Sequence, residues 1–197
     1  MTEIGPLFRQ ALWLALALGL LLFGLLTLAV HALEPMGIAP EVRPTAAAFL
    51  HGIRWGIPAL TLYFCLRYLC DGLHWTLPTM AFGFGGLLVL LPLGYALTFG
   101  AFGLPEGGAG GLGLASSIML WLQVLGFLAY LARARRFEAM RLFDRFDPPR
   151  WREISALLRT GLPIGVTVAM EGGLFIATAL LIGRLGELEV AAHQIAI

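Results

Sequence analysis

One acidic residue, Glu171, stands inside a long apolar stretch, and its position suggests chemistry more strongly than any other in the chain. Eleven uncharged residues precede it from Thr160, and twelve follow it up to Gly183. A stretch of this length can cross a bilayer as a helix, which would put the carboxylate near the midplane. A charge there costs at least about 2.5–3.5 kcal/mol, so such residues usually face a cavity or a partner. Glu171 is therefore predicted to bind an ion or a proton.

Four other side chains share the helical face of Glu171. At about 100° per residue, three threonines fall within about 40° of it, and one aromatic residue lies in the same sector; they are Thr160, Thr167, Thr178 and Phe175. We expect Thr167, Phe175 and Thr178 to line a cavity beside Glu171. The alternative is a protonated Glu171 that is hydrogen-bonded across a helix pair.

A second, weaker polar stripe occurs earlier in the chain. Ser116, Gln123 and Tyr130 recur every seven residues and therefore lie on one face of a helix. Hydrogen bonding between helices is the expected role of such a stripe in a membrane. Gln123 is also a candidate for the lining of a cavity.

The sequence contains no recognisable catalytic or metal-binding motif. Cys65 and Cys70 lack C-x-x-C spacing, His193 lacks metal-ligand spacing, and no Gly-rich phosphate loop is present. We therefore expect no enzyme, no metal and no cofactor. One alternative stays open at this point, a membrane-embedded enzyme that uses Glu171 with His51 or His193.

The composition indicates a polytopic membrane protein. Of the 197 residues, 59% are hydrophobic and only 13% are charged, whereas a soluble domain carries about 25% charged residues. The net charge of +1 shows no basic excess, so a nucleic-acid partner is not expected, and an ordinary soluble enzyme or a disordered chain is excluded. Because backbone groups in lipid must be hydrogen-bonded internally, the spans are predicted to be helices.

Charged residues divide the chain into five apolar segments of membrane-spanning length, with a sixth starting near Val190. Arg54 lies near the outer end of the second segment and is expected to extend its charge to the interface. In the third segment, Ala81 and Gly85 have the spacing that permits close helix contact. The five predicted spans lie near residues 11–31, 47–68, 77–99, 112–132 and 160–183.

The distribution of arginine predicts the orientation. The stretch 133–159 holds eight arginines and four acidic residues, and the positive-inside rule makes it cytoplasmic. Alternating spans then put Arg9 and Arg67 inside, and Arg43 and Arg184 outside.

A boundary between two helix bundles is predicted within this basic stretch. Asp147, Pro148 and Pro149 have the pattern of a helix start, with the aspartate as cap and proline in the first turn. A short interfacial helix is expected to follow and to lead into the last complete span.

Several motifs resemble the MATE family of multidrug and toxic compound extrusion transporters. The run GLPIG from Gly161, then Glu171, Phe175 and the run AAHQIA from Ala191 are similar to the start of that family's second half. The run RYLCDG from Arg67 is similar to the loop between its fourth and fifth helices.

The resemblance implies an all-α membrane fold with twelve helices in two lobes, of which this chain would be an internal fragment covering about helices three to eight. Residues 1–132 would be the remainder of the first lobe, with four transmembrane helices. Residues 133–159 would be the cytoplasmic inter-lobe linker, and residues 160–197 the start of the second lobe, with one full helix and a truncated one. The remainder of the transporter would be missing.

The family further implies an antiporter that exports organic cations and drugs in exchange for Na⁺ or H⁺. Such a protein would be a multi-pass protein of the bacterial inner membrane, surrounded by lipid. Glu171 lines up with the acidic residue by which the family's seventh helix binds a cation. No ion site is expected in the first lobe, because Leu90 and Gly94 stand near positions that are polar in many members. The other reading is an inactive truncated fragment.

Overall fold

The computed structural model describes all residues except 1–3, 34–39, 41–42, 104, 135–146 and 184–197, and these described residues form helices and no strand. The α-helices are α1 (Ile4–Ala32), α2 (Arg43–Ile53), α3 (Ile57–Gly72), α4 (Thr76–Phe99), α5 (Gly108–Arg133) and α7 (Trp151–Gly183). Two short 3₁₀ helices, η1 (Arg54–Gly56) and η2 (Ala101–Gly103), complete the set. The predicted all-α class is confirmed. The predicted sixth segment, from Val190, lies outside the described residues.

Four of the described helices are long and apolar enough to cross a membrane, namely α1, α4, α5 and the part of α7 up to Leu174. The chain divides into two compact units, Met1–Pro149 and Arg150–Ile197. The predicted inter-lobe linker, residues 133–159, spans this division, and residues 135–146 of it lie outside the described part of the structure. Each unit is therefore considered by itself.

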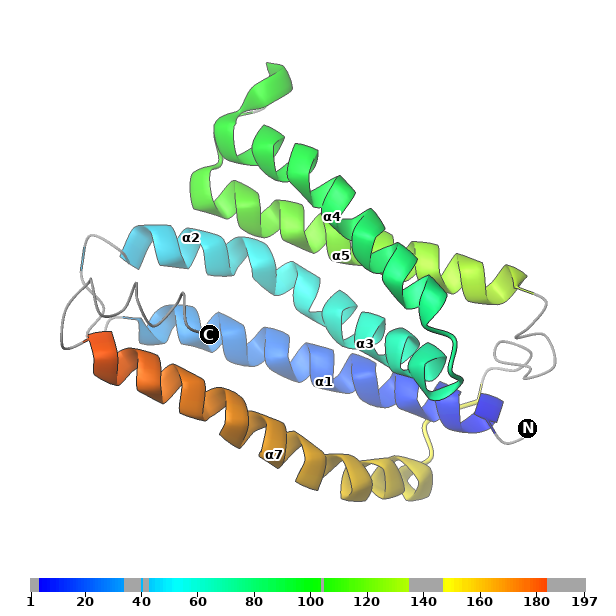
Figure 1. Ribbon diagram of the computed structural model, residues 1–197. Helices are drawn as coiled ribbons and strands as arrows, with labels where there is room; N and C mark the ends of the chain where they lie inside the picture. The colour runs from blue at the N-terminus through cyan, green and yellow to red at the C-terminus, as the bar shows by residue number, and fades with distance from the viewer. Residues whose placement is uncertain (1–3, 34–39, 41–42, 104, 135–146, 184–197) are drawn as a thin grey trace. The chain divides into compact units, whose positions relative to one another are not determined.

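The first unit is a bundle in which α1, the α2–α3 pair, α4 and α5 run in alternating directions (Figure 1). Helix α1 packs along α3, α5 packs along α2 and α4, and α3 also contacts α5. The N-terminal end of α1, the α3–α4 turn and the C-terminal end of α5 lie at one end of the bundle (Figure 1). This arrangement agrees with the alternation that the arginine distribution predicts.

The core of the first unit lies where α1, α3 and α5 meet. Leu66 of α3 and Phe127 of α5 are fully buried, and Phe8 of α1 packs in the same cluster. The Phe82 ring of α4 stacks on Phe127, with their centroids 4.7 Å apart. Stacked rings add about 0.5–1.5 kcal/mol to the burial of their apolar area, so this cluster fixes all four elements together.

The second predicted span, 47–68, is not one helix but two. Helices α2 and α3 are joined by η1, and the break has a local cause. Pro58 has no N–H to donate to the Arg54 carbonyl, and the Ile57 N–H donates to that carbonyl instead. This hydrogen bond spans three residues instead of four, which is the 3₁₀ pattern, and it winds the backbone more tightly at the break.

Side chains of α5 hold this break. Ser117 Oγ donates to the Gly52 carbonyl at 2.8 Å and lies 3.2 Å from the Ile53 carbonyl. One turn later, Trp121 Nε1 donates to the Trp55 carbonyl at 2.9 Å. A Cβ on Gly56 would lie 2.8 Å from the Ser117 Cα. The absence of a side chain at Gly56 therefore allows α5 to come close enough for these bonds.

The face of α4 that contacts α5 differs by one residue from the prediction. A Cβ on Gly85 would meet nothing within 4 Å, and Ala81 is exposed. Gly86 lies instead at the contact, where a Cβ would overlap the Gln123 side chain. The close approach predicted from Ala81 and Gly85 is thus wrong, and Gly86 provides it.

Helix α7 is continuous from Trp151 to Gly183, so the helix predicted to lead into the last span is present and runs into that span without a break, while its interfacial position stays a prediction. Pro163 lies inside α7; proline removes one backbone N–H, which apolar spans tolerate. The predicted cap at Asp147 is wrong. The helix begins four residues later, and the amides of Glu153 and Ile154 both donate to the Arg150 carbonyl at 3.0 Å.

Candidate functional site

Glu171 lies on α7, and its side chain is exposed within the second unit. All residues from Gly161 to Leu174 are exposed as well. At 1.5 Å per residue, Glu171 is about 18 Å along the helix from Arg159, close to half of the roughly 30 Å hydrocarbon thickness. A bilayer boundary at Arg159 would therefore put the carboxylate near the midplane.

The three threonines of the predicted stripe direct their hydroxyl groups along α7. Thr160, Thr167 and Thr178 donate to the carbonyls four residues earlier, at 3.2, 3.1 and 2.8 Å. A hydroxyl that donates backwards still has acceptor lone pairs. Thr167 and Thr178 can therefore offer neutral oxygen atoms to a cation on the Glu171 face. Phe175 lies in α7, but its side chain is outside the described part of the structure.

Gln123 belongs to the first unit, where it bridges α5 and α4. Its Nε2 donates to the Phe82 carbonyl at 2.7 Å. The predicted hydrogen bonding between helices is therefore confirmed for Gln123. It is wrong for Ser116, which donates to Leu112 of its own helix at 3.0 Å. Tyr130 instead packs its ring edge-on against Phe82, with centroids 6.1 Å apart.

Ser117 is a buried polar residue that the sequence prediction missed. It is buried, and it joins α5 to the break between α2 and α3. A signal for it was available, because Gly113 and Ser117 are four residues apart, as are Gly52 and Gly56. Small residues at this spacing on two segments are typical of close helix contact.

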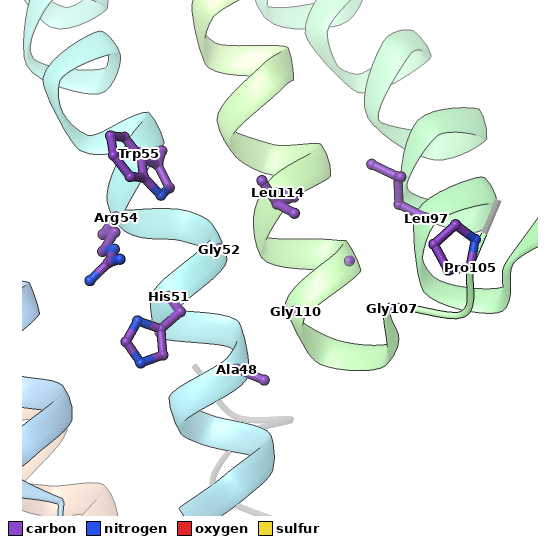
Figure 2. A pocket seen from close by; sticks show the side chains of 11 residues that line it. Ala48, His51, Gly52, Arg54, Trp55, Leu97, Pro105, Gly107, Gly110 and Leu114 are labelled. Atoms are coloured by element: carbon purple, nitrogen blue, oxygen red, sulfur yellow. The ribbon is translucent and has the colours of Figure 1, made fainter.

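An open depression of about 510 Å³ lies among α2, the end of α4 and the start of α5 (Figure 2). Glycines form much of its lining, and His51 and Arg54 are the polar side chains beside it. The Arg54 guanidinium lies 5.7 Å from the Phe23 ring centroid and 5.6 Å from that of Trp55. These are cation–π distances, so Arg54 is held by aromatic rings of α1 and η1.

The described residues contain no metal-binding cluster. No group of three or more His, Cys, Asp or Glu side chains that could hold a metal occurs among these residues. His51 is exposed on α2, in the first unit, whereas Glu171 is in the second. His193, the other histidine of the enzyme alternative, lies outside the described residues.

Comparison with known proteins gives consistent matches. A family model described as MatE matches residues 1–96. The probable multidrug resistance protein NorM of Xanthomonas campestris pv. campestris is 66% identical over 195 residues, which cover 99% of this chain and 43% of that protein.

More distant relatives carry similar names. The multidrug resistance protein PmpM of Pseudomonas aeruginosa is 43% identical over 98% of this chain and 41% of its own length. The multidrug resistance protein MdtK of Yersinia pestis is 37% identical over the whole chain and 43% of its own length. The chain thus spans less than half the length of these relatives.

Proposed function

Because the chain belongs to the MatE family, whose members are transporters and not enzymes, we propose that it forms part of a multidrug efflux antiporter. The antiporter resides in the bacterial inner membrane and exports organic cations in exchange for Na⁺ or H⁺. The helices and the relatives make it a multi-pass membrane protein. The enzyme alternative is dropped, since the family consists of transporters.

The position of Glu171 carries the ion-coupling part of the proposal. Its carboxylate is the charged group at the middle of the apolar part of α7 that follows Arg159, twelve residues from Arg159 and twelve from Gly183. A charge in that place is costly unless it has a partner. A bound Na⁺ or a proton neutralises it, and the lone pairs of Thr167 and Thr178 add neutral ligands for Na⁺, which prefers oxygen.

Exchange follows if the coupling cation and the organic cation compete for the negative charge. The site releases its drug when Na⁺ or H⁺ neutralises Glu171, and it binds a new drug after the ion has left. Rocking of one lobe against the other exposes the site to each side in turn. The partners of the chain are then membrane lipid, an organic cation, a coupling cation and the rest of the transporter.

The test uses a full-length chimera in which this chain replaces the aligned segment of the Xanthomonas campestris relative. Cells that lack their own efflux pumps express the chimera and are loaded with a fluorescent organic cation. We expect lower accumulation than in cells with an empty vector, and a return to the vector level when either the Na⁺ or the H⁺ gradient is collapsed. Accumulation equal to the vector control, or efflux that depends on neither gradient, would contradict the proposal.

A further inference from the structure

A cluster of polar contacts joins the first turns of α1 to the residues just before α7. Arg9 Nε donates to Asp147 Oδ2 at 2.8 Å, and Arg9 Nη2 donates to the same oxygen. The Gln10 amide donates to the Pro148 carbonyl and the Trp13 indole to the Asp147 carbonyl, both at 3.0 Å. We call these five residues the α1 clasp.

The clasp is shielded from water, unlike two other ion pairs of the described residues. The side chains of Arg9 and Asp147 are 13% and 18% exposed, whereas those of Arg67 and Asp71 are 44% and 32% exposed. Exposed pairs contribute little to stability, but removing one partner of a shielded pair leaves a charge without compensation. Of these ion pairs, the Arg9–Asp147 pair of the clasp is therefore the one whose loss should disturb the structure.

The clasp holds backbone as well as a side chain. The carbonyls of Asp147 and Pro148 both accept hydrogen bonds from α1, and Gln10, which donates one of them, is 1% exposed. Two successive peptide groups are thus fixed on the N-terminal end of α1. A pair of charges alone would allow this segment to rotate, whereas three donors on two successive residues define its path.

In the sequence, the clasp residues Asp147 and Pro148 come directly before the boundary between the two units. All of its residues belong to the first unit, which ends at Pro149, and the second unit begins at Arg150. Helix α7 begins at Trp151, so only Pro149 and Arg150 separate the clasp from the helix that carries Glu171. Movements between domains are absorbed by a few residues at the ends of elements.

We propose that the α1 clasp is the fixed pivot of transport. It holds Asp147 and Pro148 on the predicted cytoplasmic end of α1 while α7 moves about Pro149 and Arg150. This inference rests on the proposed function, because a pivot matters only if the lobes rock against each other. Arg9 and Asp147 are accordingly positioning residues that touch neither ion nor drug.

Charge reversal tests the pair in the full-length chimera. Arg9→Asp and Asp147→Arg each place like charges together, and we expect each to lower the rate of efflux about tenfold, which corresponds to ~1.4 kcal/mol. The double variant restores the attraction with exchanged partners and should recover most of the rate at equal amounts in the membrane. If the single variants transport like the wild type, or if the double variant is no better than either, the clasp is not the pivot.

Arg67→Asp is the matched control. It makes the same change of charge on the same predicted side of the membrane, in an exposed pair that lies outside the clasp. Its efflux should stay within about twofold of the wild type, because an exposed pair contributes ~0–1 kcal/mol. An equal loss in this control would assign the effect to membrane orientation and would overturn the proposal.

A cross-link separates a fixed pivot from a latch that opens in every cycle. In a background of Cys65→Ala and Cys70→Ala, cysteines replace Gln10 and Pro148, and a short bifunctional thiol reagent joins them. A fixed pivot predicts a high yield of cross-link and efflux that the cross-link does not reduce. Efflux that the cross-link blocks and a cleavable version of the reagent restores would overturn the proposal.

The two hypotheses fail in different ways. A chimera that shows no efflux in its wild-type form contradicts the proposed function. A chimera that transports normally while Arg9→Asp has no effect contradicts the pivot alone. The yield of the cross-link, which needs no transport, tests the position of the clasp separately: a yield no higher than for cysteines at Gln10 and Gly103 would contradict it.

Discussion

Single small residues decide where the helices of this protein touch. Gly86 allows the Gln123 amide to reach the Phe82 carbonyl, and Gly56 allows Ser117 to approach the break in the second span. The sequence indicated that small residues would matter in α4, but it did not indicate which face they occupy. Helix α4 contains four glycines in an almost uniformly apolar sequence, so its pattern does not distinguish one face from another.

Gly86→Ala should destabilise the protein. The new methyl group would overlap the Gln123 side chain, and overpacking of this kind costs about 1–3 kcal/mol. The measurement is the thermal unfolding of the detergent-solubilised chain. The matched control is Gly85→Ala, where a Cβ meets nothing within 4 Å, and its unfolding temperature should be unchanged or higher because alanine favours the helix. Equal destabilisation by both substitutions would show that the α4–α5 contact is wrongly assigned.

Glu171 was singled out in the sequence because it is a lone charge in an apolar run. The spacing of the threonines did not predict that their hydroxyl groups donate to carbonyls of α7 itself. The same spacing is compatible with donation along the helix or to a neighbouring helix. The role of the Glu171 site remains a prediction, because the lining of a cavity depends on the helices that pack against α7.

At the scale of elements, the break in the second span depends on two parts of the chain that are far apart. Pro58 indicates locally that a carbonyl loses its donor. Ser117 and Trp121, which donate to the nearby Gly52 and Trp55 carbonyls, come from α5, more than sixty residues later. A sequence read segment by segment therefore predicts one helix there, and the structure shows two.

Ser117→Ala should weaken the α2–α5 contact. It leaves the Gly52 carbonyl without its donor from α5, and hydrogen bonds between membrane helices contribute about 0.6–1.7 kcal/mol. Unfolding of the solubilised chain by heat measures the loss. Ser116→Ala is the neighbouring control, because its hydroxyl bonds only within α5; we expect a change within about 0.5 kcal/mol. A larger effect at Ser116 than at Ser117 would contradict the assignment of the contact.

Asp147 shows how a long-range contact can override a local signal. An aspartate followed by two prolines is typical of a helix start, and the sequence prediction followed that signal. In the structure the carboxylate pairs with Arg9, 138 residues earlier, and the helix begins at Trp151 without it. A cap contributes only about 0.5–2 kcal/mol, and here the carboxylate is used instead in a partly buried ion pair with Arg9.

At the scale of the whole molecule, composition and charge distribution predicted most of the architecture. The low charge content led to the all-α membrane class, and the relatives that match the chain are named as multidrug resistance proteins. The contact between Arg9 and Asp147 also agrees with the predicted topology, which puts both residues on the cytoplasmic side.

The central claim is that Glu171 couples the movement of a cation to the export of a drug. The most direct measurement uses the purified full-length chimera in proteoliposomes, with uptake of an organic cation driven by an imposed Na⁺ or H⁺ gradient. Glu171→Gln is compared with Glu153→Gln, which removes an acid at the exposed start of the same helix. The account predicts that Glu171→Gln abolishes gradient-driven transport while Glu153→Gln retains it. Undiminished coupled transport by Glu171→Gln would contradict the account.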